Sequence, residues 1–101
     1  MTMVKKNVVA GPWLDDVPQD KVFRRHGGYA VKNLYELSSA LREMPEETFR
    51  HHTSKDKNDF SNWVRDVIGD MTLAEQLQKA ATHITTTQKV ESRLNWLRAR
   101  L

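Results

Sequence analysis

The segment from Asn58 to Gly69 carries the pattern that most constrains what this chain can fold into. Its apolar residues recur at three- and four-residue spacing, and they are Phe60, Trp63, Val64, Val67 and Ile68. That spacing predicts an amphipathic helix with one wide apolar face. Asn58 is typical of a residue that caps a helix N-terminus, and Gly69 stands where a left-handed residue ends one. We therefore expect a helix here, with Trp63 in the core.

Similar patterns predict two helices before this segment. Asn33 and Glu36 form a capping box, in which the asparagine side chain accepts from a free backbone N–H and the glutamate reaches back. The apolar residues that follow at helical spacing are Leu34, Leu37, Leu41 and Met44. Pro45 suits the first turn of a further short helix ending near residue 53, which would turn Phe49 and His52 inward.

Two more helices are predicted after it. Thr72 and Glu75 form a second capping box. The apolar stripe behind it is Leu73, Leu77, Ala80, Ala81 and Ile84. The threonines at 85–87 are unfavourable inside a helix and suit the start of a new one. The last helix would place on one face Val90, Leu94, Leu97 and Leu101. Whether 85–101 packs on the domain or projects from it is open at this point.

Residues 21–31 predict a short β-hairpin. Gly27 and Gly28 supply the positive-φ positions that a two-residue turn needs. Residues 1–20 lack sustained periodicity, and we expect them to form an N-terminal tail or extended lead-in to a single domain over 21–101. Because two strands alone are not stable in water, the hairpin must lean on the helices. The predicted fold is therefore mainly α, or a small α+β, with a short N-terminal β-hairpin packed on four to five short helices.

The composition excludes several functional classes. The 101 residues contain no cysteine, which excludes disulfides, iron–sulfur clusters, cysteine-ligated zinc and thiol nucleophiles. The sequence carries neither a glycine-rich phosphate loop nor a nucleophile elbow. It has no stretch of membrane-spanning length and no secretory signal region, so we expect a cytoplasmic protein. We predict no cofactor and no small-molecule substrate.

Histidines and aspartates in the middle of the chain invite a metal or acid–base site. His51 and His52 are adjacent, so on a helix they point about 100° apart and cannot both face one ion. Asp59 and Asp66 share a helix face, but Asp59 and Asp70 stand where carboxylates stabilise helix starts. We therefore predict no metal site, no catalytic residue and no enzyme activity. An enzyme centred on His52, Asp59 and Asp66 is kept as a third alternative.

Basic and aromatic residues gather on the predicted hairpin and on the last helix. The candidate interaction surface consists of Arg24, Arg25, Tyr29, Lys89, Arg93, Trp96 and Arg100. Cations around an aromatic side chain are typical of surfaces that bind nucleic acid or an acidic partner, and also of a solvated helix face. The net charge of +3, with basic ends and an acidic middle, is low for a protein that binds duplex DNA.

These observations favour a non-enzymatic interaction module that binds another protein or associates with itself. A nucleic-acid-binding protein that uses the basic and aromatic surface is the alternative.

A longer motif runs from Phe49 to Ala74, and it reads F-x-x-H followed by N-D-F-x-x-W-V-x-D-V-x-G-D-x-x-L-A. Its fixed positions are Phe49, His52, Asn58, Asp59, Phe60, Trp63, Val64, Asp66, Val67, Gly69, Asp70, Leu73 and Ala74. With the hairpin and the helix after Asn33, it resembles a small uncharacterised prokaryotic domain family over residues 22–80. The resemblance implies the same hairpin-and-helix fold. Because the family has no known activity, the resemblance implies no function.

Overall fold

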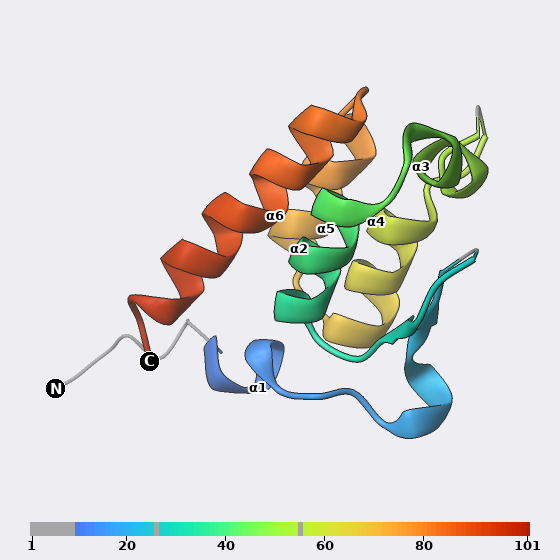
Figure 1. Ribbon diagram of the computed structural model, residues 1–101. Coiled ribbons are helices and arrows are strands. Elements are labelled where there is room, and N and C mark those ends of the chain that lie inside the picture. Colours follow the sequence, from blue (N-terminus) through green and yellow to red (C-terminus); the bar gives the residue numbers. More distant parts are fainter. Residues whose placement is uncertain (1–9, 26, 55) are drawn as a thin grey trace, which may run out of the picture.

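The computed structural model describes residues 10–25, 27–54 and 56–101 (Figure 1). Its helices are α1 Ala10–Leu14, α2 Leu34–Glu43, α3 Glu46–His52, α4 Asp59–Trp63, α5 Met71–Lys79 and α6 His83–Arg98. A 3₁₀ turn spans Gln19–Lys21, and a π-helical turn over Val64–Ile68 continues α4. The two strands are β1 Phe23–Arg24 and β2 Ala30–Val31. The predicted fold class, mainly α with a small N-terminal hairpin, is confirmed.

The hairpin differs from its prediction in the length of its turn. β1 and β2 pair antiparallel, with Phe23 opposite Val31 and Arg24 opposite Ala30, so residues 25–29 connect them. Among the described residues of this connection only Gly27 has a positive φ, of 72°. The predicted two-residue turn at Gly27 and Gly28 is therefore wrong. The register that is observed buries both Phe23 and Val31 against the helices, which local turn preferences do not determine.

The cap of α2 is confirmed, with its second bond shifted by one residue. The Asn33 side chain accepts from the backbone N–H of Glu36 at 2.8 Å. The Glu36 carboxylate reaches back to the N–H of Lys32, at 3.0 Å, one residue before the cap. Two N–H groups at this end are thereby satisfied, as a capping box requires.

The helical segment from Asn58 to Gly69 begins and ends at the residues predicted. Asn58 caps α4 by accepting from the N–H of Ser61 at 3.0 Å, and its amide donates to the carbonyl of Leu77 in α5 at 2.9 Å. Gly69 ends the π-helical turn in the left-handed conformation, with φ 93°. Glycine is favoured there because a side chain is strained at such a φ.

The caps of the last two helices differ from the prediction. Asp70, not Thr72, caps α5, because its carboxylate accepts from the N–H of Leu73 at 3.1 Å. Thr82 caps α6 by accepting from the N–H of Thr85, so the threonines at 85–87 lie inside the first turns of α6. Each true cap stands a few residues before the predicted one.

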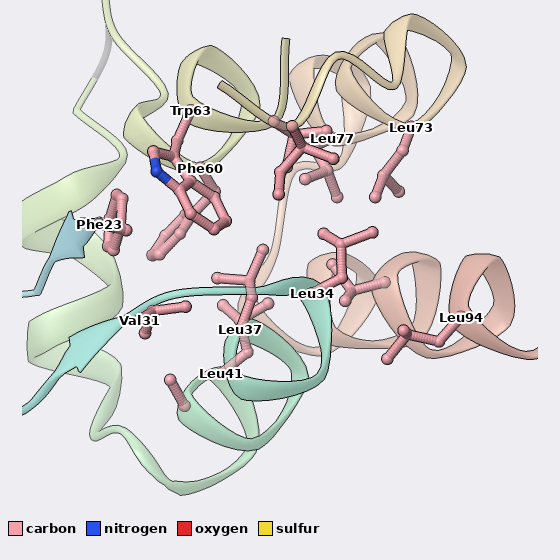
Figure 2. Packing of buried hydrophobic residues seen from close by; sticks show 14 of the residues in the cluster. Phe23, Val31, Leu34, Leu37, Leu41, Phe60, Trp63, Leu73, Leu77 and Leu94 are labelled. Atoms are coloured by element: carbon pink, nitrogen blue, oxygen red, sulfur yellow. The ribbon is translucent and has the colours of Figure 1, made fainter. Parts of the chain in front are cut away.

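The core lies where α2, α4, α5 and α6 converge (Figure 2). Figure 2 shows leucines of α2 facing leucines of α5, with Phe60 and Trp63 beside them. Trp63 is buried as predicted, and its indole N–H donates to the carbonyl of Lys21 at 2.8 Å. The fully buried leucines are Leu34, Leu37, Leu41, Leu73, Leu77 and Leu97.

Helix α6 packs along α2 and α5 rather than standing free (Figure 1). Its buried side chains are Thr86, Val90, Leu94 and Leu97. Three residues predicted to lie in apolar stripes are exposed, namely Ala81, Ile84 and Leu101. Ile84 lies outside the stripe because α5 ends at Lys79, and Leu101 lies beyond the end of α6.

The prediction of a tail or extended lead-in needs correction at residues 10–14. This stretch forms the short helix α1, which contacts α6 and α2. It buries Ala10 and Leu14, and Trp13 packs against the core cluster. Burial of these apolar side chains stabilises a helix too short to form alone. Residues 1–9 of the predicted tail lie outside the described residues.

Thr86 offers a test of the packing of α6. It is fully buried, and its hydroxyl has no hydrogen-bond partner among the described residues. Replacement by valine keeps the shape and removes a buried polar group, so Thr86→Val should raise the free energy of unfolding by about 1 kcal/mol. Thr87→Val is the matched control and should not stabilise, because the Thr87 hydroxyl donates to the carbonyl of His83. Urea unfolding measures both, and a Thr86 variant less stable than wild type would contradict the packing described.

Candidate interaction surface

The seven candidate residues lie in two separate groups (Figure 1). Arg24, Arg25 and Tyr29 belong to the hairpin and its connection. Three others lie on α6, namely Lys89, Arg93 and Trp96, and Arg100 lies just beyond its end. Figure 1 shows the strands well apart from the end of α6. The structure therefore does not join the seven into one surface.

The Arg25 side chain packs against α2 and is not exposed to solvent as the prediction of an interaction surface requires. Its side chain is 10% exposed, and its guanidinium donates to the Glu43 carboxylate at 3.0 Å and to the carbonyl of Ala40 at 3.5 Å. Arg25 thereby fastens the hairpin to the last turn of α2. Two other candidate residues of the hairpin remain accessible. Arg24 has no ion pair with a described residue, and Tyr29 is almost fully exposed.

Arg93 forms a buried ion pair with Asp70. Its side chain is 12% exposed, and two of its nitrogens donate to the two Asp70 oxygens at 2.7 and 2.9 Å. The same carboxylate caps α5, and it is fully buried. Two parallel bonds between guanidinium and carboxylate are the strongest arrangement for such a pair. The charge of Arg93 therefore holds the start of α5 against α6.

Two guanidinium groups lie close to the ring of Trp96, one from Arg93 in α6 and one from Arg100 just beyond the end of that helix. The Arg93 guanidinium carbon is 4.4 Å from the ring centroid, and that of Arg100 is 3.6 Å from it. Arg93 also lies 5.7 Å from the ring of Trp13 in α1, which extends the series of cation–π contacts across two helices. The Trp96 side chain is thus engaged within the protein, although the residue is 38% exposed.

The aspartates considered for acid–base chemistry have three different partners. The Asp59 carboxylate lies 2.9 Å from Nδ1 of His52. Asp66 pairs with Arg65 on the surface, and hydrogen bonding to that guanidinium lowers the pKa of Asp66. Asp70 forms the buried ion pair with Arg93. The three carboxylates do not form one site, and no group of three or more potential metal ligands occurs among the described residues.

His83 is a polar residue that the sequence analysis did not single out. Its ring stacks on Phe49 with 4.7 Å between centroids. Its Nε2 contacts the carbonyl of Leu41 and its Nδ1 lies 3.2 Å from the carboxylate of Glu46. His83 thereby connects α2, α3 and α6. No local spacing indicates this role, because the three partners lie 34 or more residues earlier in the chain and only tertiary packing brings them to His83.

A seam between α2 and α6, called here the α2–α6 seam, is hollowed at two places. The Tyr35 hollow has a volume of about 300 Å³, and its lining includes Tyr35, Ser38, Leu94, Asn95 and Arg98. The Ile84 hollow has a volume of about 230 Å³, and its lining includes Leu41, His83, Ile84, Thr87 and Gln88. Arg42 lines both hollows, and it pairs with Glu91 across the seam.

Each hollow has one large, exposed apolar side chain at its rim. Tyr35 is 40% exposed and Ile84 is 71% exposed. Neither residue was predicted to belong to a functional surface. A signal was present for Tyr35, which stands beside the apolar stripe of α2 instead of within it. No such signal was present for Ile84, because its spacing places it in the apolar stripe of α5, and only the structure shows that α5 ends at Lys79.

No helix in the described part of the chain is both long and apolar enough to cross a membrane. A family model described as "Family of unknown function (DUF5752)" matches residues 18–98. No curated protein and no solved structure matches the chain. The match confirms the resemblance to an uncharacterised family and extends it through α6, which the resemblance over 22–80 did not include. Helix α1 lies outside the matched residues.

Proposed function

This chain belongs to the family of unknown function DUF5752, and we propose that it is a non-enzymatic interaction module that binds a protein chain through the α2–α6 seam. The bound chain is either a different protein or a second copy. We further propose that it acts in the cytoplasm, in keeping with the absence of cysteine.

The observation that carries this proposal is the pairing of each hollow with an exposed apolar side chain. Tyr35 and Ile84 stand at opposite ends of the seam, with the Arg42–Glu91 ion pair between them. Apolar anchors surrounded by polar groups are typical of the residues that dominate protein–protein binding. Grooves between helices are also common docking places for helical segments of partner proteins.

The same geometry gives less support to the nucleic-acid alternative. Arg25 and Arg93, two of its five cations, are held by carboxylates of the protein itself. A nucleobase would need a free face of Trp96 for stacking, but two guanidinium groups already lie over that ring. Only Arg24 and Lys89 of the candidate cations lack a charged or aromatic partner among the described residues.

Chemical cross-linking in a cell lysate tests the proposal. Wild-type protein should be cross-linked to a partner, either a different protein or a second copy, and Tyr35→Lys should reduce that capture at least tenfold, because a charge would replace the apolar anchor. Met71→Lys is the matched control, since Met71 is an exposed apolar residue on α5 away from the seam. Capture by both variants alike, or by neither, would contradict the proposal.

Fluorescence anisotropy with labelled DNA and RNA tests the alternative on the same samples. We expect no micromolar binding. Binding that weakens at least about tenfold between about 50 and 200 mM salt would require several phosphate contacts. That result would overturn the proposed function in favour of a nucleic-acid-binding protein.

A further inference from the structure

We infer that the Tyr35 hollow of the α2–α6 seam binds a carboxylate group, which an aspartate or glutamate side chain of the partner chain supplies. The inference rests on the proposed function and states what the partner presents at this end of the seam. It follows from hydrogen-bond donors in the hollow that have no partner among the described residues, and from the balance of the charges there.

Ser38 is the most deeply buried polar residue of the hollow. It is 5% exposed and lies on the buried side of α2. Its hydroxyl forms no hydrogen bond with a described residue, whereas the similarly buried hydroxyl of Ser61 donates to the carbonyl of Ala74 at 2.7 Å. The Ser38 hydroxyl is not sealed in the core as that of Thr86 is, and it therefore opens into the hollow that Ser38 lines. An acceptor placed there would satisfy a donor that is largely withdrawn from water.

Further donors line the same hollow on both helices. Tyr35 of α2 carries a hydroxyl, and Asn95 and Arg98 of α6 carry an amide and a guanidinium group. None of these three side-chain groups is hydrogen-bonded to a described residue. A carboxylate fits this set because its oxygens offer about four acceptor positions and no donor. An apolar side chain in the hollow would leave all of the donors without a partner.

The charges of the hollow favour an anion with a single charge. Arg98 is exposed and has no acidic partner among the described residues. The other charged residues of the lining, Arg42 and Glu91, pair with each other. One carboxylate would therefore balance the unpaired cation of the described lining. A phosphate group, with a charge of about −1.5 to −2 at pH 7, would leave excess negative charge beside Glu91.

A titration with acetate, followed by heteronuclear NMR of the full chain, tests the chemistry of the site. At constant ionic strength, acetate should cause saturable shifts of the Asn95 side-chain amide and of the Ser38 backbone N–H. Acetamide, which has a similar shape but no charge, should cause none. Arg98→Gln should remove the saturable shifts, and Arg100→Gln, just beyond the end of α6, is the matched control that should keep them. No saturable shift with acetate, or tighter binding of phosphate than of acetate, would overturn the inference.

Carbodiimide cross-linking in a cell lysate tests whether the partner chain supplies the carboxylate. Arg98→Lys keeps the positive charge and provides an amine, which the reagent joins directly to a carboxylate in contact with it. Mass spectrometry should find this amine joined to an aspartate or glutamate of the partner chain, at least tenfold more often than the amine of Arg100→Lys. Equal coupling of the two amines would mean that the hollow does not select the carboxylate, and the inference would be wrong.

A charge reversal separates this inference from the proposed function. Arg98→Glu leaves the Tyr35 ring in place and should reduce capture from the lysate at least tenfold, because two carboxylates would then meet. Tyr35→Lys, which tests the proposed function, should also reduce capture, since it removes the ring and leaves one carboxylate facing two cations. Circular dichroism should show that both variants stay folded, because both side chains are exposed. If only Tyr35→Lys reduces capture, the proposed function stands and the inference is wrong; if neither variant does, both are wrong.

Discussion

Arg93→Ala should lower the free energy of unfolding by about 3–5 kcal/mol, because it leaves a buried carboxylate without its counter-ion. Asp70 is fully buried and is bonded at both oxygens by the Arg93 guanidinium. The substitution also removes the cation between Trp13 and Trp96. Since small domains are stable by only about 5–15 kcal/mol, this single change should bring the protein close to unfolding. Thermal and urea unfolding followed by circular dichroism measure the effect.

Two control variants identify the cause of that loss. Arg100→Ala removes an exposed cation just beyond the end of α6 and should lower the free energy of unfolding by less than about 1 kcal/mol, because exposed charge contacts contribute little. Asp70→Ser combined with Arg93→Met keeps a capping oxygen and removes both charges. That double variant should be more stable than Arg93→Ala alone, because no unpaired charge is then buried. Equal destabilisation by Arg93→Ala and Arg100→Ala would show that the buried pair is not the cause.

Phe60→Ala should lower the free energy of unfolding by a similar amount, about 3–5 kcal/mol, because it opens a cavity in the core. The Phe60 ring is fully buried and lies 5.2 Å from the ring of Phe23, 5.7 Å from Phe49 and 5.4 Å from His52, measured between centroids. These contacts join the hairpin, α3 and α4. The loss should therefore weaken the hairpin as well as the helix that carries Phe60.

Hydrogen exchange and unfolding experiments distinguish this outcome from a local effect. Backbone N–H groups of the hairpin should exchange faster in Phe60→Ala than in wild type, because the two strands depend on the aromatic contacts for support. Met71→Ala, which truncates an exposed side chain, should leave both stability and exchange nearly unchanged. A Phe60 variant with normal stability would mean that the aromatic cluster is not the centre of the core.

Local sequence signals predicted the features that depend on neighbouring residues. The caps at Asn33 and Asn58 and the left-handed Gly69 were predicted correctly, because each acts within one turn of its own helix. The caps of α5 and α6 were misplaced for a related reason. Asp70 and Thr72 both stand near the start of α5, and several threonines stand near the start of α6, so more than one residue fits the local pattern at each.

The charge pattern of the candidate surface did not reveal which of its cations are paired inside the protein. Arg93 lies in a helical stripe with Lys89, Trp96 and Arg100, and the stripe is real in the sequence. Whether a cation in such a stripe faces solvent depends on what lies opposite. Here Asp70, 23 residues earlier, occupies that position and binds Arg93 inside the protein.

The sequence by itself therefore determined the helical fold class, most helix positions and the apolar residues of the core, since periodicity and capping act over a few residues. The tertiary structure alone decided the register of the hairpin, the docking of α1, the burial of the Arg93–Asp70 pair and the existence of the α2–α6 seam. Each of these features depends on contacts between residues far apart in the chain. Such contacts are selected by the burial and pairing of whole elements, which no local pattern encodes.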